Sequence, residues 1–270
     1  MRASREPAVA GRFYPSDPVR LTAEVDEYLV GEQPAEALAL VAPHAGYMYS
    51  GKIAGRTYSA VRVPAHAIVI CPNHTGFGVK RSVWSSGSWM LPVGEVAVDA
   101  SLAGRLCDEA CLEADEDAHL AEHAIEVQLP FLRASAPGIS VVPICLARLS
   151  YADCVQVGQG IARVVEERRA AGEQVLLVAS TDMSHYISAE QARRLDQMAI
   201  EQILKIDPEG LYQTVTRHSI SMCGYIPTTV VLAAAKQLGG QRCELIAYGN
   251  SGDASGDHAR VVGYAGLVVR

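Results

Sequence analysis

Four apolar runs of the chain each end in a turn of small residues that carries a histidine or an aspartate. The runs lead to His44 in APHAG, His74 in CPNHTG, Asp182 and His185 in STDMSH, and Asp253 in NSGD. Apolar runs rich in Val, Ile and Leu that stop at Pro, Gly, Ser or Asn are typical of buried strands. In an open α/β sheet, ligands bind at the loops after the carboxyl ends of the strands. The pattern therefore predicts one site of imidazole and carboxylate groups, which suits a divalent metal ion.

The strand-like runs alternate with helical patterns along the chain. Strands are predicted at residues 38–43, 67–71, 140–146, 174–180, 243–249 and 261–269, and helices at 18–30, 51–61, 99–113, 120–133, 150–169, 187–206 and 227–238. Residues 79–99 alternate apolar and polar side chains around turn residues, which predicts a short antiparallel excursion. This alternation indicates an α/β fold with a central, mostly parallel sheet flanked by helices. Because no linker or repeat interrupts it, we expect residues 1–270 to form a single layered domain.

Composition and charge exclude several classes of partner. The net charge of -7 and the lack of any basic cluster leave nothing to hold the phosphates of a nucleic acid. No apolar stretch reaches the length that spans a bilayer, and no signal peptide is recognisable, so we expect a cytoplasmic protein that does not enter the membrane. The seven cysteines form no C-x-x-C pair. We interpret them as reduced thiols, and Cys223 in SMCGYIP as a small buried hydrophobic residue rather than a reactive group.

His44 and His74 occupy matching places after two predicted strands and are the first candidates for metal ligands. Asp253 would complete a set of two histidines and one carboxylate, which leaves positions open on Fe(II). His185 would instead complete a three-histidine site of the kind that holds zinc and a water molecule. His258 in GDHAR is a weaker third choice. The residues alone leave these alternatives open.

Two further groups carry ionisable side chains with suggestive spacing. Asp182 and His185 lie three residues apart, which fits a general acid/base with an orienting carboxylate, although Asp182 could simply cap a helix. Glu122, His123 and Glu126 lie together in AEHAIEVQLPF on a predicted helix. From spacing alone, this second group is typical of an exposed pair on a helix surface.

Taken together, several motifs give the chain a resemblance to the MEMO family. They are AVAGRFYP, APHAGYMYSG, CPNHTG, LPVGEVAVD, EHAIEVQLPF, STDMSHY, CGYIP and YGNSGDASGDHARVVGYAG, in that family's order and over nearly the whole chain. The resemblance implies the fold of the class III extradiol dioxygenases, whose non-haem iron is held by two histidines and a carboxylate.

The resemblance also implies roles for individual residues. His44 and His74 match the family's metal-binding histidines, Asp182 and His185 match residues that line the same pocket, and His123 matches a further site histidine. Animal members supply a cysteine as third ligand from the C-terminal loop. Counted from Tyr248, that position is Ala254 here. Either Asp253 or His185 is therefore expected to replace the thiolate, or the metal is held by two protein ligands and water.

These matches imply an oxidoreductase, or a relative of one, that acts on a small aromatic or chelating substrate. Fe(II) is the expected metal, with zinc or copper as alternatives, and His185 or His123 would exchange protons with the substrate. Animal members are linked to cell motility signalling, metal handling and redox chemistry. Prokaryotic members are often encoded beside a radical-SAM protein, which is therefore a possible pathway partner.

Two other functions fit the same residues. One is a non-catalytic protein whose pocket binds an acidic or phosphorylated partner segment. The other is a zinc-dependent hydrolase in which His44, His74 and His185 surround a water molecule. The metal content of the protein distinguishes these hypotheses, because iron, zinc and no metal each favour a different one.

Overall fold

The computed structural model describes residues 4–31 and 33–270. Its strands are β1 (Ser4–Arg5), β2 (Ala39–Ala42), β3 (His66–Pro72), β4 (Arg81–Val83), β5 (Ser88–Leu91), β6 (Gly94–Val98), β7 (Glu113–Ala114), β8 (Ser140–Leu146), β9 (Val175–Ser180), β10 (His185–Ile187), β11 (Cys243–Asn250) and β12 (Val261–Val269). Its helices are α1 (Pro18–Tyr28), α2 (Tyr47–Ser59), α3 (Ala100–Ala110), α4 (Asp117–Leu120), the 3-10 turn η1 (Glu126–Gln128), α5 (Leu129–Ser135), α6 (Tyr151–Ala170), α7 (Ala189–Leu204), α8 (Pro208–Arg217), α9 (Tyr225–Gln237) and α10 (Gly252–Ser255).

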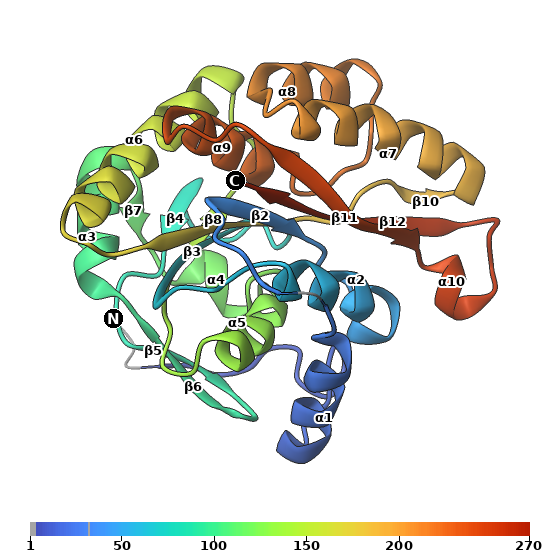
Figure 1. Cartoon of the computed structure of the whole chain (residues 1–270), viewed down its shortest axis with the longest axis horizontal. Coiled ribbons are helices and arrows are strands. Elements are labelled where there is room, and N and C mark those ends of the chain that lie inside the picture. Colours follow the sequence, from blue (N-terminus) through green and yellow to red (C-terminus); the bar gives the residue numbers. More distant parts are fainter. Residues whose placement is uncertain (1–3, 32) are drawn as a thin grey trace.

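Within the described residues, the strands form one twelve-stranded sheet with helices on both faces (Figure 1). The main path of the sheet is β1-β5-β6-β8-β3-β9-β2-β12-β10, while β11 pairs with β12, and β4 pairs with β7 and β8. The strands β8, β3, β9 and β2 at its centre run parallel to one another. This architecture confirms the predicted α/β fold, and the antiparallel β5–β6 hairpin confirms the excursion expected at residues 79–99.

The central strands are buried on both faces, which explains why their sequences are continuous apolar runs. One core cluster packs α3, α6, α7, α8 and α9 against the sheet, through residues such as Val157 and Ile161. The other packs α1, α2 and α5 against the opposite face, through residues such as Leu21 and Tyr58. The carboxyl ends of β3, β9 and β2 therefore meet at one edge of a rigid three-layer body.

The structure corrects the helix expected at residues 120–133. That stretch instead contains the end of α4, the turn η1 and most of α5, and Glu122 and His123 lie in the irregular segment between α4 and η1. Pro130 cannot lie in the interior of a continuous helix, but it fits the first turn of α5, where its missing backbone N–H costs no hydrogen bond. The helix α8 was not predicted, although Asp207 caps it and Pro208 begins it.

A buried ion pair ties the amino-terminal segment to the middle of the chain. Arg5 Nη1 lies 2.7 Å from Glu126 Oε2, and the two side chains are 1% and 0% exposed. The Arg5 guanidinium also donates to the Glu122 carbonyl and lies over the Trp89 ring, while Tyr14 donates to Glu126 Oε1. Because buried charges are stable only when they are paired and hydrogen-bonded, these contacts fix the segment that carries Glu122.

Replacement of Arg5 by methionine is expected to lower the free energy of unfolding by about 3 kcal/mol, because it leaves the Glu126 carboxylate buried without its counter-charge. Urea denaturation measures this difference. A matched control is Arg62→Met, which removes an exposed ion pair with Glu36 (68% and 83% exposed) and is expected to cost less than about 1 kcal/mol. Equal losses in the two variants would contradict a structural role for the buried pair.

No helix in the described residues has the combined length and apolarity needed to cross a bilayer.

Candidate metal centre

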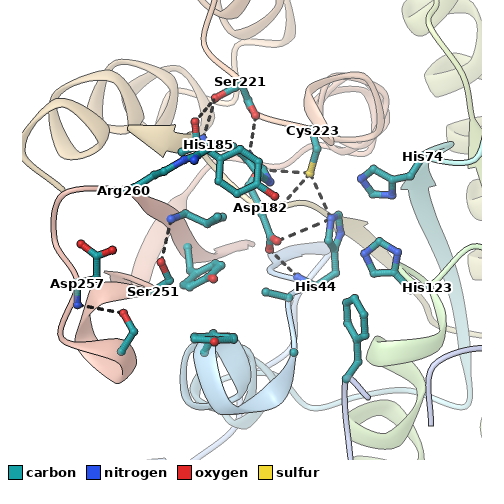
Figure 2. A pocket seen from close by; sticks show the side chains of 18 residues that line it. His44, His74, His123, Asp182, His185, Ser221, Cys223, Ser251, Asp257 and Arg260 are labelled. Atoms are coloured by element: carbon teal, nitrogen blue, oxygen red, sulfur yellow. Dashed lines mark hydrogen bonds and ion pairs between the residues drawn. The ribbon is translucent and has the colours of Figure 1, made fainter. Parts of the chain in front are cut away.

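Two histidines and a cysteine bring their ligand atoms together at the carboxyl edge of the sheet. One ligand atom from each of His44, His74 and Cys223 lies within 4.8 Å of the other two. His44 Nε2 is 3.2 Å from Cys223 Sγ, and the two imidazole rings are 5.1 Å apart. Figure 2 shows these three side chains pointing toward one another from different segments of the chain.

The fold explains why these three residues meet. His44 and His74 each lie two residues beyond a central strand, β2 and β3, and both strands neighbour β9. Cys223 directly precedes Gly224, the N-cap residue of α9. A side chain on Gly224 would come within 2.6 Å of the Ser180 carbonyl oxygen, so glycine allows this turn to pack against the end of β9.

Hydrogen bonds orient the two imidazole rings. His44 Nδ1 lies 3.0 Å from Ser180 Oγ, and His74 Nδ1 lies 2.9 Å from Glu122 Oε1. Both contacts involve Nδ1, which leaves Nε2 of each ring as the available ligand atom. Such outer contacts are typical of metal-binding histidines, because they fix the tautomer and the ring orientation.

Glu122 is a buried carboxylate shared by two histidines. It accepts hydrogen bonds from His74 Nδ1 and the His74 backbone N–H, and His123 Nδ1 lies 3.2 Å from the same Oε1. Burial raises the pKa of Glu122, but the hydrogen bond from His74 and the charges of His74 and His123 outweigh it and bring the pKa down to about 2. Glu122 is therefore ionised and favours a proton on Nδ1 of both rings.

The histidines differ in their affinity for protons. Burial, followed by repulsion from His74, lowers the pKa of His44 to about 3. Burial, followed by repulsion from His44, lowers the pKa of His123 to about 4. Burial also acts to lower the pKa of His74, but the hydrogen bond and charge of Glu122 outweigh it, so the net change is upward. At neutral pH His44 and His123 are thus neutral, as a metal ligand or a proton acceptor must be.

Asp182 holds the turn that carries His44. Its Oδ1 accepts a hydrogen bond of 2.8 Å from the His44 backbone N–H, and its Oδ2 lies 4.0 Å from His44 Nε2. The Asp182 backbone N–H in turn donates to Cys223 Sγ at 3.3 Å. Burial raises the pKa of the Asp182 carboxyl. No helix starts at this residue, so the alternative that Asp182 caps a helix is wrong, and its contacts are with the cluster itself.

A pocket of about 740 Å³ opens beside the cluster. His44, His74, His123, Asp182 and Cys223 line one end. Aromatic rings make much of the remaining wall, namely Phe13, Tyr49, Tyr186 and Tyr264. The volume lies in the range that accommodates a small-molecule ligand.

Comparison with known proteins places the whole chain in one family. Residues 5–268 match the model of the Memo-like proteins. The chain belongs to the Memo-like family. It is 41% identical to a MEMO1 family protein of Methanosarcina mazei and 39% identical to one of Aquifex aeolicus, each over 98% of both chains. These matches confirm the family resemblance of the sequence motifs.

A solved structure shares the fold of this Memo-like chain at low sequence identity. It is the crystal structure of uncharacterized protein JW3007 from Escherichia coli K12, with a TM-score of 0.53 and 16% identity. The match covers 84% of this chain and 98% of the other. It supports the α/β architecture alone.

Some of the predicted site residues of this Memo-like protein lie at the cluster of His44, His74 and Cys223, and others lie away from it. His123 stacks on His74 with the ring centroids 4.8 Å apart and lines the same pocket. His185 lines the pocket, but its Nδ1 lies 2.9 Å from the Ser221 carbonyl oxygen. The described residues contain two groups of potential metal ligands, and His185 belongs to neither: one is His44, His74 and Cys223, and the other is His74, Glu122 and His123. The three-histidine set of His44, His74 and His185 is therefore not assembled.

Asp253 does not reach the cluster. Its Oδ2 accepts a hydrogen bond from the Asn250 backbone N–H. Asp253 is not among the described residues that line the pocket. The physical reason is the sheet order and the length of β11. The strand β12 separates β11 from β2, and β11 continues to Asn250, well past Leu245, which is level with Val41 of β2. His258 is likewise absent from the described lining, and its Nδ1 packs near Gly252.

Cys223 is the residue that the sequence interpretation missed. It was expected to be a buried hydrophobic residue, yet its sulfur contacts His44 and lines the pocket. The third candidate donor thus comes from the segment before α9 rather than from the C-terminal loop around Ala254. A cysteine followed by glycine at the start of a predicted helix was the available signal, but only the fold shows that this turn meets the ends of β2 and β3.

Proposed function

We propose that this Memo-like protein binds one transition-metal ion through His44, His74 and Cys223 and acts as an oxidoreductase on a small chelating aromatic substrate. The convergence of three donor atoms next to a pocket of ligand size carries the proposal. The reaction class rests on the likeness to extradiol dioxygenases, in which metal and substrate lie side by side. A bound ion would supply a Lewis-acid and redox centre.

The donor set fits a transition metal in geometry and chemistry. Metal bonds of about 2.0 Å to nitrogen and 2.3 Å to sulfur in a tetrahedral site place the two donors about 3.5 Å apart. The 3.2 Å between His44 Nε2 and Cys223 Sγ is close to this separation. Three protein donors also leave at least one coordination position for a substrate, as in catalytic metal sites.

The thiolate changes the expected preference among metals. Fe(II) was favoured over copper on the assumption of a carboxylate from Asp253, and a soft sulfur donor weakens that argument. We retain Fe(II) as the ion for an oxidoreductase and propose that zinc and Cu(I) compete for the site more strongly than they would at a carboxylate site. Metal analysis of protein purified without oxygen identifies the resident ion.

His123 is the proposed proton acceptor. Its Nδ1 faces Glu122, so Nε2 is available on the pocket side, and its lowered pKa keeps it neutral at pH 7. Its ring lies between Phe13 and His74, with centroids 4.7 Å and 4.8 Å away, which fixes its orientation. A positioned, neutral imidazole beside the metal ligands is able to take a proton from a substrate hydroxyl group.

Metal affinity is expected to rise with pH between pH 6 and 8. Burial raises the pKa of the Cys223 thiol well above its usual range, so metal binding must release the thiol proton, which increases affinity about ten-fold per pH unit. His44 contributes no proton in this window, because its pKa is about 3, whereas the raised pKa of His74 means that release of its proton adds to the slope at the acidic end of the window. Competition with a chromophoric chelator under anaerobic, reducing conditions measures the slope.

The matched control is Cys223→Asp. Its carboxyl group is already ionised in this pH range, so the slope is expected to fall by about one proton, and the preference to move from zinc toward Fe(II) and Mn(II). An identical slope in the wild type and this variant would show that Cys223 is not a ligand.

A further inference from the structure

We propose that Arg260 and Tyr186 form a recognition site for a carboxylate on the substrate, at the end of the pocket away from the metal ligands. The substrate class would then be a planar chelating compound with an anionic group remote from its chelating atoms. This inference rests on the proposed function, because it assumes that the chelating end lies at His44, His74 and Cys223.

The two ends of the pocket differ in burial and charge. His44 and Asp182 at the closed end are 2% and 5% exposed, whereas Tyr186 at the other end is 65% exposed. Figure 2 shows Arg260 and Asp257 on the side of the pocket opposite His74 and His123. Among the lining residues in the described part of the chain, Arg260 alone carries a permanent positive charge. An extended ligand would therefore meet the metal donors at one end and a cation at the other.

The Arg260 guanidinium is available to a ligand. Its carbon lies 5.1 Å from the centre of the Tyr186 ring, and within residues 4–31 and 33–270 it has no hydrogen bond or ion pair. Asp257 lines the same wall three residues before Arg260, and its Oδ1 accepts a hydrogen bond of 2.9 Å from the Ala259 backbone N–H. A stacked guanidinium with free N–H groups is suited to a planar carboxylate, which it can bind through two parallel hydrogen bonds.

Tyr186 is held at the pocket by a strained backbone. Its φ of 60° lies in the left-handed region, which a bulky residue adopts only where the surrounding structure imposes it. The cause is an irregularity in the pairing of β10 with β12, where His185 pairs with Val262 and Ile187 with Val261. The bulge turns the exposed Tyr186 ring toward Arg260, which comes directly before β12. Strain retained to place an exposed aromatic ring at a pocket is typical of a binding role.

The other walls favour a flat ligand. Phe13 packs against His123, and Tyr49 and Tyr264 line the same pocket. Aromatic side chains bind planar rings through stacked or edge contacts without a specific polar partner. These walls explain recognition of the ring, and Arg260 explains recognition of its charge.

The test compares two probes that differ by one carboxylate. Calorimetry measures the binding of catechol and of 3,4-dihydroxybenzoate to zinc-loaded protein, in which no oxidation occurs. The wild type is expected to bind 3,4-dihydroxybenzoate about ten-fold more tightly, because a charge-assisted pair adds to the same chelation. In Arg260→Gln this preference is expected to disappear while catechol affinity is unchanged. Arg217→Gln, at the exposed last residue of α8, changes the net charge equally and is expected to retain the preference.

The outcomes separate this inference from the proposed function. Equal affinity of the wild type for the two probes, or a preference that survives in Arg260→Gln, overturns the carboxylate site. Failure of the zinc-loaded wild type to bind catechol overturns the chelating substrate of the proposed function instead. In that case benzoate binding, followed by ligand-observed NMR, decides the inference. Loss of benzoate binding in Arg260→Gln supports the site, and unchanged binding overturns it.

Discussion

Replacement of both His44 and His74 by alanine is expected to abolish stoichiometric binding of transition metal. Loss of one hydrogen bond that orients a ligating side chain already lowers metal affinity about 10- to 100-fold, so loss of two ligands should lower the affinity by more than about 10⁴-fold. Only the Cys223 sulfur would remain of the three donors. Metal analysis after anaerobic reconstitution and gel filtration measures the result.

His66→Ala is a control of the same residue type. His66 Nδ1 also lies against a serine hydroxyl, at 2.9 Å from Ser140 Oγ, but the residue begins β3 and so lies at the opposite edge of the sheet. This variant is expected to retain its metal. Full metal occupancy in the His44→Ala/His74→Ala protein would refute the proposed centre, provided that circular dichroism shows the metal-free protein to be folded.

Replacement of His123 by alanine is expected to lower turnover by about 10²- to 10⁴-fold, the usual contribution of a positioned proton acceptor. Oxygen consumption by iron-loaded protein with a catechol substrate measures this loss. Metal content and substrate affinity should stay close to those of the wild type, because His123 is not one of the three donors that include Cys223.

His185→Ala provides the comparison within the same pocket. His185 is tied to the Ser221 carbonyl and lies outside the described ligand groups, so a smaller loss is expected. A large loss in His185→Ala together with a small loss in His123→Ala would move proton transfer to the pair of His185 and Asp182. From spacing alone, the sequence favoured His185 with Asp182 for this role and placed His123 on a helix surface; only the family resemblance added His123.

The sheet was predictable because its strands are continuous apolar runs with clear ends. All six predicted strands, from residues 38–43 to 261–269, agree with the structure to within one residue at each end. The convergence of His44, His74 and Asp182 followed from the parallel order of β3, β9 and β2. Short elements such as β10 escaped prediction because three residues carry too little periodicity to distinguish a strand from a loop.

The third candidate donor, Cys223, was not predictable by the same reasoning. Asp253 follows a predicted strand just as His44 does, and only the strand order shows that β12 lies between them. Cys223 follows no strand at all, and the pattern around it is dominated by the apolar helix α9. Likewise, Glu122 and His123 were placed on a continuous helix, whereas contacts made by Arg5 and Glu126 hold this segment in an irregular turn.

The position of β12 has a consequence for the synthesis of the protein. This strand occupies residues 261–269 of a 270-residue chain, yet it pairs with β2 on one side and β11 on the other. Until residues 261–269 have left the ribosome, the apolar edge of β2 has no partner and is exposed to pairing with other chains. Folding during synthesis must therefore pause at an open sheet, and deletion of residues 261–269 should favour aggregation over a smaller folded product.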